Sequence, residues 1–336
     1  MSPDFFTPTA LPASERPHLV TVVDTEEEFD WSAPLSRENV NVSAIDEIGR
    51  LQAVFERYGL KPTYVVDFPV ATTSSSVDRL KEILVRGKCD IGAHLHPWVN
   101  PPHMETVGAR NSFACNLGAS LERDKIAALK NAIRENFGVS PRVYKAGRYG
   151  FGKTTAETLE ALHFDVDNSV NPHYDFTSEG GPDFSAFDAS PATFGRERQL
   201  LELPCTTAFV GAARKFGTGL HRTASSTLLR PVRAVGVLAR SQLLNRVMLS
   251  PEGNTLDEMQ RLTMTLTADG VRTFVLTLHS PSVKPGCTQY ARTAAERDAL
   301  LGTIDRYCEF FMKTLRGVTT TPAQLHARLT QKLTHV

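Results

Sequence analysis

The sequence predicts an α/β protein in which parallel strands alternate with helices. Apolar, strand-like runs are separated by segments of helical periodicity, and several of those segments end at a glycine. Strands that alternate with helices pair in parallel, because each right-handed crossover returns the chain to the same end of the sheet. The loops that follow the strands therefore gather at one end of the sheet, where such folds hold their chemistry.

The strand-like runs are short, apolar and rich in β-branched or aromatic residues. Seven are found, at residues 18–24, 63–68, 89–96, 142–146, 164–170, 200–204 and 273–279. The side chains of interest are those at the carboxyl ends of these runs, since they share one face of the sheet. They include Asp24, His94 with His96, Lys145 and His279.

The helices are predicted between these runs. Residues 43–58 place an apolar stripe on one helical face and end before Gly59, and further helices are expected near 77–85 and at 120–137 before Gly138. Thr154 with Glu157, and Thr293 with Glu296, are spaced as capping boxes, so we expect each pair to open a helix. The second of these helices is expected to be the last in the chain.

Composition indicates a globular protein and excludes several classes of partner. The 336 residues are 41% hydrophobic, which is enough for one large domain or two ordinary ones. Lys plus Arg and Asp plus Glu each number 37, so overall charge favours neither nucleic acid nor an anionic membrane. No apolar run approaches the roughly 18 residues of a membrane helix, and no export signal is recognised. Five dispersed cysteines without Cys-x-x-Cys spacing favour a reducing cytoplasm.

One short stretch offers a nucleotide-binding alternative. "GRYGFGKT", residues 147–154, fits the phosphate-loop pattern and lies between a predicted strand and a predicted helix. Arg148, Tyr149 and Phe151 are bulky, however, where such a loop must bend closely around phosphates. No apolar strand ending in Asp follows it, so the pattern favours a chance match.

A metal-dependent hydrolase site is better supported. Asp24 and Glu26 are two residues apart, so at an extended strand end both carboxylates point to the same side, and His94 and His96 have the same spacing. One carboxylate and two imidazoles with an open fourth position suit a catalytic Zn²⁺. The second carboxylate can then act as general base, and His279 can protonate a leaving group. The run of three glutamates at 26–28 also allows a solvated acidic turn.

Five segments in a fixed order resemble a known family. They are "TVVDTEEEFDW", "DIGAHLHPW", "YKAGRYGFG", "FDVDNSVNP" and "FVLTLHSPSVKPG". Between about Leu19 and Leu315 the chain resembles polysaccharide deacetylases with the nodulation chitooligosaccharide deacetylase homology domain, carbohydrate esterase family four. The resemblance implies a distorted (β/α)7 barrel in a single catalytic domain of residues 18–336. Residues 1–17, before this domain, are expected to form a flexible segment. The domain itself is expected to contain a basic insertion at about 211–250.

The resemblance also implies roles for individual residues. It makes Asp24 the base, Glu26, His94 and His96 the ligands of a divalent metal, usually zinc, and His279 the catalytic histidine. It makes Lys145 or Arg148 the basic residue that orients the base and lines the groove, and Asp167 an acid near His279. In this chain the family's adjacent Asp-Asp is Asp-Thr-Glu, its histidine spacing of four is two, and its arginine is Lys145.

The expected activity is removal of an N-acetyl or related acyl group from an amino sugar or glycan precursor. Trp98 and Tyr149 are candidates to stack on sugar rings, although Trp98 is equally suited to packing the barrel mouth. An amidase for a small amide, or a carbohydrate- or nucleotide-binding protein without catalysis, stays open, as does an oligomer. Residues 211–250 hold seven basic and no acidic residues. They are predicted either to be a solvated insertion or to face the phosphate of a substrate, with Arg230, Arg233 and Arg240 named as contacts.

Overall fold

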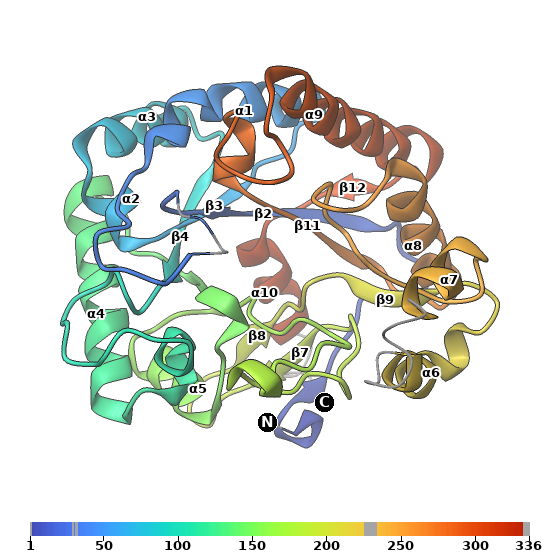
Figure 1. Ribbon diagram of the computed structural model, residues 1–336, viewed down its shortest axis with the longest axis horizontal. Helices are drawn as coiled ribbons and strands as arrows, with labels where there is room; N and C mark the ends of the chain where they lie inside the picture. The colour runs from blue at the N-terminus through green and yellow to red at the C-terminus, as the bar shows by residue number, and fades with distance from the viewer. Residues whose placement is uncertain (1, 29, 31–32, 225–233, 332–336) are drawn as a thin grey trace.

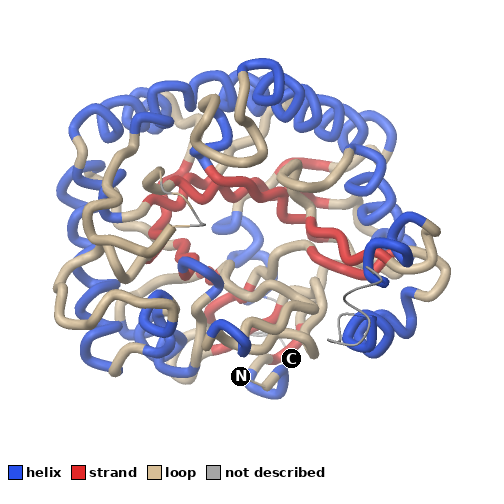
Figure 2. The backbone as a smooth tube through the Cα atoms, in the orientation of Figure 1, coloured by secondary structure: helices blue, strands red, loops and turns tan. Residues whose placement is uncertain are grey.

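The protein is built as a curled, mostly parallel sheet that helices surround. The computed structural model describes residues 2–28, 30, 33–224 and 234–331 (Figure 1). Figure 2 shows the strands as an inner band and the helices as an outer layer. The α/β class predicted from the alternating pattern is confirmed.

Seven of the strands that run parallel in the main sheet are the seven that the sequence predicts. In spatial order they are β8 (Leu200–Glu202), β6 (Val166–Asp167), β5 (Val143–Ala146), β4 (Asp90–Leu95), β3 (Thr63–Val66), β2 (His18–Thr25) and β11 (Thr273–His279). The sheet curls as a barrel does but does not close strand to strand. Beyond β8 it continues antiparallel into β7 (Ala192–Phe194), rather than onto β11.

Alternate residues of these strands face two different cores. Val20, Val22, Val143 and Val275 pack in the inner core of the curled sheet, while their neighbours along the strands pack outward against the helices. The inner rows, continued toward the carboxyl ends of β2, β4, β5 and β11, lead to Asp24, His94, Lys145 and His279. The period of two thus places these polar side chains above an apolar interior.

The outer layer consists of helices with one apolar face toward the sheet. It contains α1 (Ile48–Arg57), α2 (Phe68–Thr72), α3 (Ser74–Val85), α4 (Ala119–Phe137), α5 (Lys153–Ala161), α8 (Leu256–Ala268) and α9 (Ala294–Glu309). As predicted, α4 ends at Gly138, which adopts the left-handed conformation with φ of 73°. Thr293 caps α9 as predicted, accepting a hydrogen bond from the Glu296 N–H at 3.2 Å.

Two predictions about helices were wrong. Helix α5 is capped by Gly152 rather than Thr154, because the Gly152 N–H donates to Thr155 Oγ1 at 3.0 Å and the helix begins earlier. Helix α9 is not the last, since α10 (Pro322–Gln331) follows the short strand β12 (Val318–Thr319), which pairs with β2. Leu325 and Leu329 of α10 are buried in the inner core, so α10 plugs the curled sheet (Figure 1).

The gap beside β11 is filled by a second, two-stranded antiparallel sheet of β9 (Thr207–Val210) and β10 (Asn245–Met248). The Thr277 N–H of β11 donates to the Leu249 carbonyl at 3.1 Å, which joins the two sheets. The predicted basic insertion includes β10, α6 (Gly217–Ala224) and α7 (Ala234–Arg240). Arg230 and Arg233, named above as phosphate contacts, lie outside the described residues.

The described part of the N-terminal segment, residues 2–17, packs against the sheet, and its flexibility stays a prediction. Strand β1 (Thr7–Pro8) pairs antiparallel with β7. Phe6 is buried and packs edge-on against Phe187 and Phe194, and Leu11 is buried in the inner core. The apolar residues in this otherwise polar stretch account for its packing.

Candidate active site

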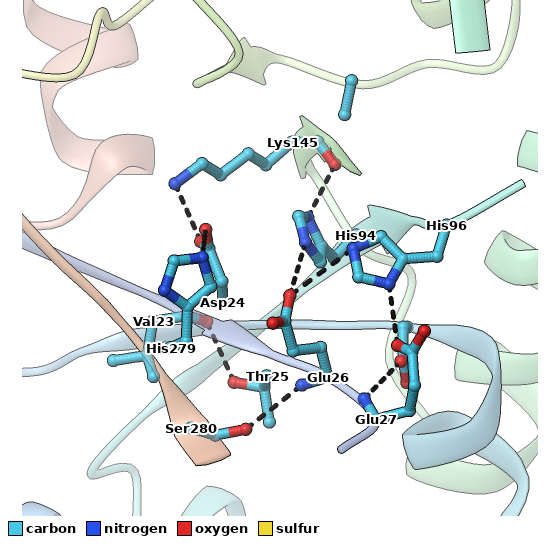
Figure 3. Close-up of polar contacts among 12 residues, drawn as sticks. Val23, Asp24, Thr25, Glu26, Glu27, His94, His96, Lys145, His279 and Ser280 are labelled. Atoms are coloured by element: carbon cyan, nitrogen blue, oxygen red, sulfur yellow. Dashed lines mark hydrogen bonds and ion pairs between the residues drawn. The ribbon is translucent and has the colours of Figure 1, made fainter. Parts of the chain in front are cut away.

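Polar side chains from four parallel strands and their following loops line one pocket of about 1020 Å³ at the carboxyl ends of the strands. Asp24 and Glu26 come from β2 and the residue after it, and both face this pocket, as their spacing predicts. His94, Lys145 and His279 reach it from neighbouring strands, and Figure 3 shows them converging on the two carboxylates.

Glu26, His94 and His96 form a compact cluster of metal-ligand type. Glu26 Oε2 lies 3.2 Å from His94 Nε2 and 3.4 Å from His96 Nε2. All three side chains are buried, and their ligand atoms lie within 4.8 Å of one another. Burial alone would raise the pKa of Glu26, but the neighbouring histidines, His279 first, lower it, so the carboxylate is ionised.

The hydrogen bonds around this cluster favour a cation at its centre. His94 Nδ1 lies 3.1 Å from the backbone carbonyl of Lys145, which can only accept, so Nδ1 carries the proton. His96 Nδ1 lies 2.7 Å from Glu27 Oε2, and burial lowers the pKa of His96. His94 Nε2 then presents a lone pair to Glu26 Oε2, and His96 Nε2 faces the same oxygen. Two imidazole nitrogens and an ionised carboxylate that converge in a buried site are a donor set that fits a divalent metal.

Asp24 is held beside this cluster by a buried ion pair. Lys145 Nζ donates to Asp24 Oδ1 at 2.8 Å and to Thr277 Oγ1 at 3.1 Å. Burial would raise the pKa of Asp24, but Lys145, followed by His94 and His279, lowers it. The carboxylate is therefore ionised, and its second oxygen is directed toward His279. Of the two basic residues that the sequence offered for this role, the one in contact with Asp24 is Lys145.

His279 is held from the opposite side by Glu252. His279 Nδ1 lies 2.7 Å from Glu252 Oε2, and the Glu252 carboxylate also accepts from the Ser282 hydroxyl. His279 Nε2 points into the pocket, 3.7 Å from Asp24 Oδ2. Burial lowers the pKa of His279, but Glu252, then Glu26 and Asp24, outweigh it and raise the pKa to about 10. A proton on Nε2 is thus available at neutral pH.

Replacing Glu252 with glutamine is expected to lower the pKa of His279 from about 10 toward its ordinary value. The carboxylate stabilises the protonated imidazole, so its removal favours the neutral form and moves the titration to lower pH. An NMR titration of the metal-free protein measures this shift. Asp257→Asn, on the exposed face of α8, is the matched control and should leave the His279 titration unchanged. An unaltered pKa in Glu252→Gln would contradict the assigned pairing.

Trp98 does not line the pocket, which corrects the prediction that it stacks on a sugar ring. Its side chain is 1% exposed, and its ring stacks on that of His96 at a centroid distance of 4.3 Å. Its indole N–H donates to Glu27 Oε1 at 2.9 Å. The alternative expectation, that Trp98 packs the barrel mouth, is the one that holds. Glu27 is likewise buried, so the three glutamates do not form a solvated turn.

Asp167 faces away from the pocket, and the carboxylate bonded to His279 is that of Glu252. Val166 belongs to the inner core, so the next residue along β6 points outward. There Asp167 accepts a hydrogen bond from the Ser169 hydroxyl at 2.7 Å, and it is the register partner of Glu202 on β8. Burial raises the pKa of both carboxyls, Asp167 and Glu202, so the pair retains a proton. The predicted substrate role of Asp167 is not supported by this placement.

The glycine-rich loop after β5 forms one wall of the pocket. Arg148 and Tyr149 line it, both with positive φ, of 53° and 60°. Arg148 pairs with Glu179, and the Tyr149 ring stacks on Phe176 at 5.4 Å. A Cβ on Gly147 would lie 2.3 Å from His96 Cδ2, so this glycine allows the loop to pass against the histidine. The phosphate-loop pattern of residues 147–154 is thus explained by packing at this site, without a nucleotide.

The basic insertion contributes no residue to the lining of this pocket in the described part of the chain. Arg214 pairs instead with Asp269, and the Arg246 guanidinium lies 3.6 Å from the centre of the Tyr174 ring. Arg240 is exposed on α7. The contact of this insertion with a substrate phosphate stays a prediction.

Comparison with known proteins shows which solved structures share this fold. No family model and no curated protein matches the sequence. A solved structure assigned to the polysaccharide deacetylases, from Mycobacterium smegmatis, aligns over 97% of this chain and 96% of its own, with 18% identity and a TM-score of 0.52. The fold is that of the polysaccharide deacetylases. Another structure so assigned, from Pseudomonas aeruginosa PAO1, aligns over 93% of this chain and 89% of its own, with 14% identity and a TM-score of 0.49.

Sequence reasoning missed two residues of this site. Glu252 lies in a turn after β10, outside the strands of the main sheet, and no strand-end position marks it. Glu27 is flanked by glutamates, and only its place after an apolar strand hinted at burial. No helix in the described residues is both long and apolar enough to cross a bilayer.

Proposed function

We propose that the protein is a metal-dependent hydrolase that removes an N-acetyl or related acyl group from an amino sugar or glycan precursor. The observation that carries the proposal is the placement of three side-chain sets in one pocket. These are the Glu26, His94 and His96 cluster, the Asp24 carboxylate held by Lys145, and the His279 imidazole held by Glu252. The polysaccharide deacetylase fold supports the sugar as substrate. The cysteine usage supports a cytoplasmic location.

Glu26, His94 and His96 would hold the metal, for which zinc is the proposed ion because two imidazoles and one carboxylate are a usual catalytic zinc set. A divalent ion bound there would supply Lewis acidity, which polarises the acyl carbonyl and makes water more acidic. The Nδ1 hydrogen bonds of the two histidines keep their Nε2 atoms directed at Glu26. The protein's own residues carry out the proton transfers.

Asp24 would accept the proton from the attacking water through Oδ2, since Oδ1 is bonded to Lys145. His279 would donate its Nε2 proton to the departing sugar nitrogen, and Glu252 would stabilise the protonated ring before that step. Asp24 Oδ2 and His279 Nε2 lie 3.7 Å apart in the pocket, so base and acid can both reach one bound acyl group. Tyr149 and Arg148, on the pocket wall, are proposed to contact the sugar.

Metal-loaded protein is expected to release acetate from at least one acetylated amino sugar, and chelator-treated protein is expected to release none. The measurement is enzymatic detection of acetate across a panel of acetylated monosaccharides, nucleotide sugars and oligosaccharides, with zinc added back as control. Stoichiometric metal without acetate from any of them would favour the binding-protein alternative. Hydrolysis confined to small amides without a sugar would favour the amidase.

A further inference from the structure

The basic insertion at residues 211–250 places two short helices at the rim of the molecule. Helix α6 lies beside α7, and Figure 1 shows both near β9, away from the helices that cover the opposite side of the sheet. The Ala213 N–H, before α6, donates to the Leu243 carbonyl, after α7, at 2.9 Å. The turn that leads into α6 and the turn that follows α7 therefore lie next to each other.

Helix α6 has an inner face and an outer face. Gly217 and Ala224 are buried and Leu220 is half-buried, and their spacing of three and four residues places them on the inner face. Arg222 lies between them in sequence but is exposed, so it belongs to the outer face. Lys215, in the helical turn that precedes α6, is exposed as well.

The exposed cations of this insertion lack acidic partners. Arg214 pairs with Asp269, but Lys215, Arg222 and Arg240 form no ion pair within the part of the chain that the structure describes. Residues 211–250 contain no acid that could neutralise them locally. Although the whole chain has balanced charge, this surface is positive, and the complementary partner is anionic.

Large apolar side chains are exposed among these cations. Phe216, next to Lys215, is 76% exposed, and Leu243 is 46% exposed. Phe216 also lines a hollow of about 590 Å³, whose wall includes Phe209 and Leu220. Nucleic acid is bound chiefly through its phosphates and leaves such side chains in water, whereas the boundary between lipid headgroups and acyl chains takes them up. Cations combined with exposed apolar residues therefore favour a lipid surface.

We propose that the exposed surface of the insertion docks the protein on a membrane that carries anionic lipids. The docking surface consists of Lys215, Phe216, Arg222, Arg240 and Leu243. Its cations contact lipid phosphates, and its two apolar side chains enter the headgroup layer. The inference goes beyond the proposed function and does not depend on it.

Co-sedimentation of the whole chain with lipid vesicles tests this inference. One set of vesicles is pure phosphatidylcholine, and the other contains about one-third phosphatidylglycerol, which is anionic. The protein is expected to sediment with the anionic vesicles only. About 1 M salt should release it, because exposed charges are then screened over about 3 Å.

Removing the three cations together is expected to lower partitioning into anionic vesicles by about 100-fold, because each cation near such a surface contributes roughly fivefold. The cation variant is Lys215→Gln, Arg222→Gln and Arg240→Gln. A matched control carries the same exchanges at exposed cations on and before α4, where it should bind as wild type does. These are Lys88→Gln, Arg123→Gln and Arg134→Gln. Circular dichroism and thermal unfolding check that each variant is folded.

Phe216→Ser is expected to lower the same partitioning by about 10-fold, because the apolar contact with lipid is lost while the charges stay. The dependence of binding on salt should remain that of wild type. Undiminished binding by folded Phe216→Ser would show that this side chain does not enter the lipid and would overturn the inference.

Equal sedimentation with both kinds of vesicle, or none with either, would overturn the inference, as would the same loss in the control and the cation variant. Retention on a DNA duplex without sedimentation on anionic vesicles would assign the surface to nucleic acid and overturn it also. None of these measurements uses acetate release. Failure of the proposed function, seen as metal-loaded protein that hydrolyses no acetylated sugar, is therefore a separate result.

Discussion

Replacing Glu26 with alanine is expected to remove most of the bound divalent metal and to abolish acyl hydrolysis while the protein stays folded. Glu26 is the only carboxylate in the three-residue cluster with His94 and His96, and one oxygen faces both Nε2 atoms. Even changes outside the ligand set lower metal affinity by about 10- to 100-fold, so loss of a ligand should cost at least that much. Elemental analysis after dialysis measures the metal, and circular dichroism measures the fold.

Glu179→Gln is the matched control for that variant. Glu179 lines the same pocket but pairs with Arg148 and lies outside the cluster, so its loss should leave the metal content unchanged. His94→Ala and His96→Ala should behave as Glu26→Ala does. Undiminished metal in a folded Glu26→Ala protein would show that the ion is bound elsewhere.

Replacing Asp24 with asparagine is expected to keep the metal and to lower kcat by roughly 10²- to 10⁴-fold, the usual contribution of a general base. The amide can still accept a hydrogen bond from Lys145, but it cannot take a proton from water at neutral pH. Glu26, His94 and His96 are unaltered by this change. Steady-state acetate release at saturating substrate, together with elemental analysis, measures both effects.

Asp24→Asn also leaves the buried Lys145 ammonium without its carboxylate, and such a loss destabilises proteins by about 3–5 kcal/mol. The double variant with Lys145→Met removes both charges, so it should regain thermal stability and stay inactive. Recovery of turnover in the double variant would mean that the single variant fails through instability, and Asp24 would not be the base.

Most of the site was predictable because the functional residues continue the apolar rows that a strand pattern reveals. Val20 and Val22 face the inner core, so Asp24, two residues further on, faces the pocket above it. Val143 predicts the direction of Lys145 in the same way. The parallel arrangement, inferred from alternating strands and helices, then brings the ends of separate strands together.

The parts that the sequence did not predict depend on packing between distant segments. Glu252 reaches His279 from a turn outside the main sheet, a contact that no local periodicity encodes. Trp98 and Tyr149 are both aromatic residues near strand ends, yet only Tyr149 lines the pocket, since Trp98 is covered by its neighbours. Asp167 was carried over from a motif, although one position along β6 decides which face it takes.

Asp24 and His279 are register partners on β2 and β11. The backbone pairing of the two strands therefore places the proposed base next to the proposed acid. Five other parallel strands of the sheet lie between β2 and β11 in the chain sequence, so the ladder of β2 and β11 is a long-range pairing. Such long-range pairings form slowly, because a large loop must close first. During refolding, helical and local strand signals should therefore recover ahead of turnover. The rate at which enzymatic activity returns would then report the rate at which β2 and β11 pair.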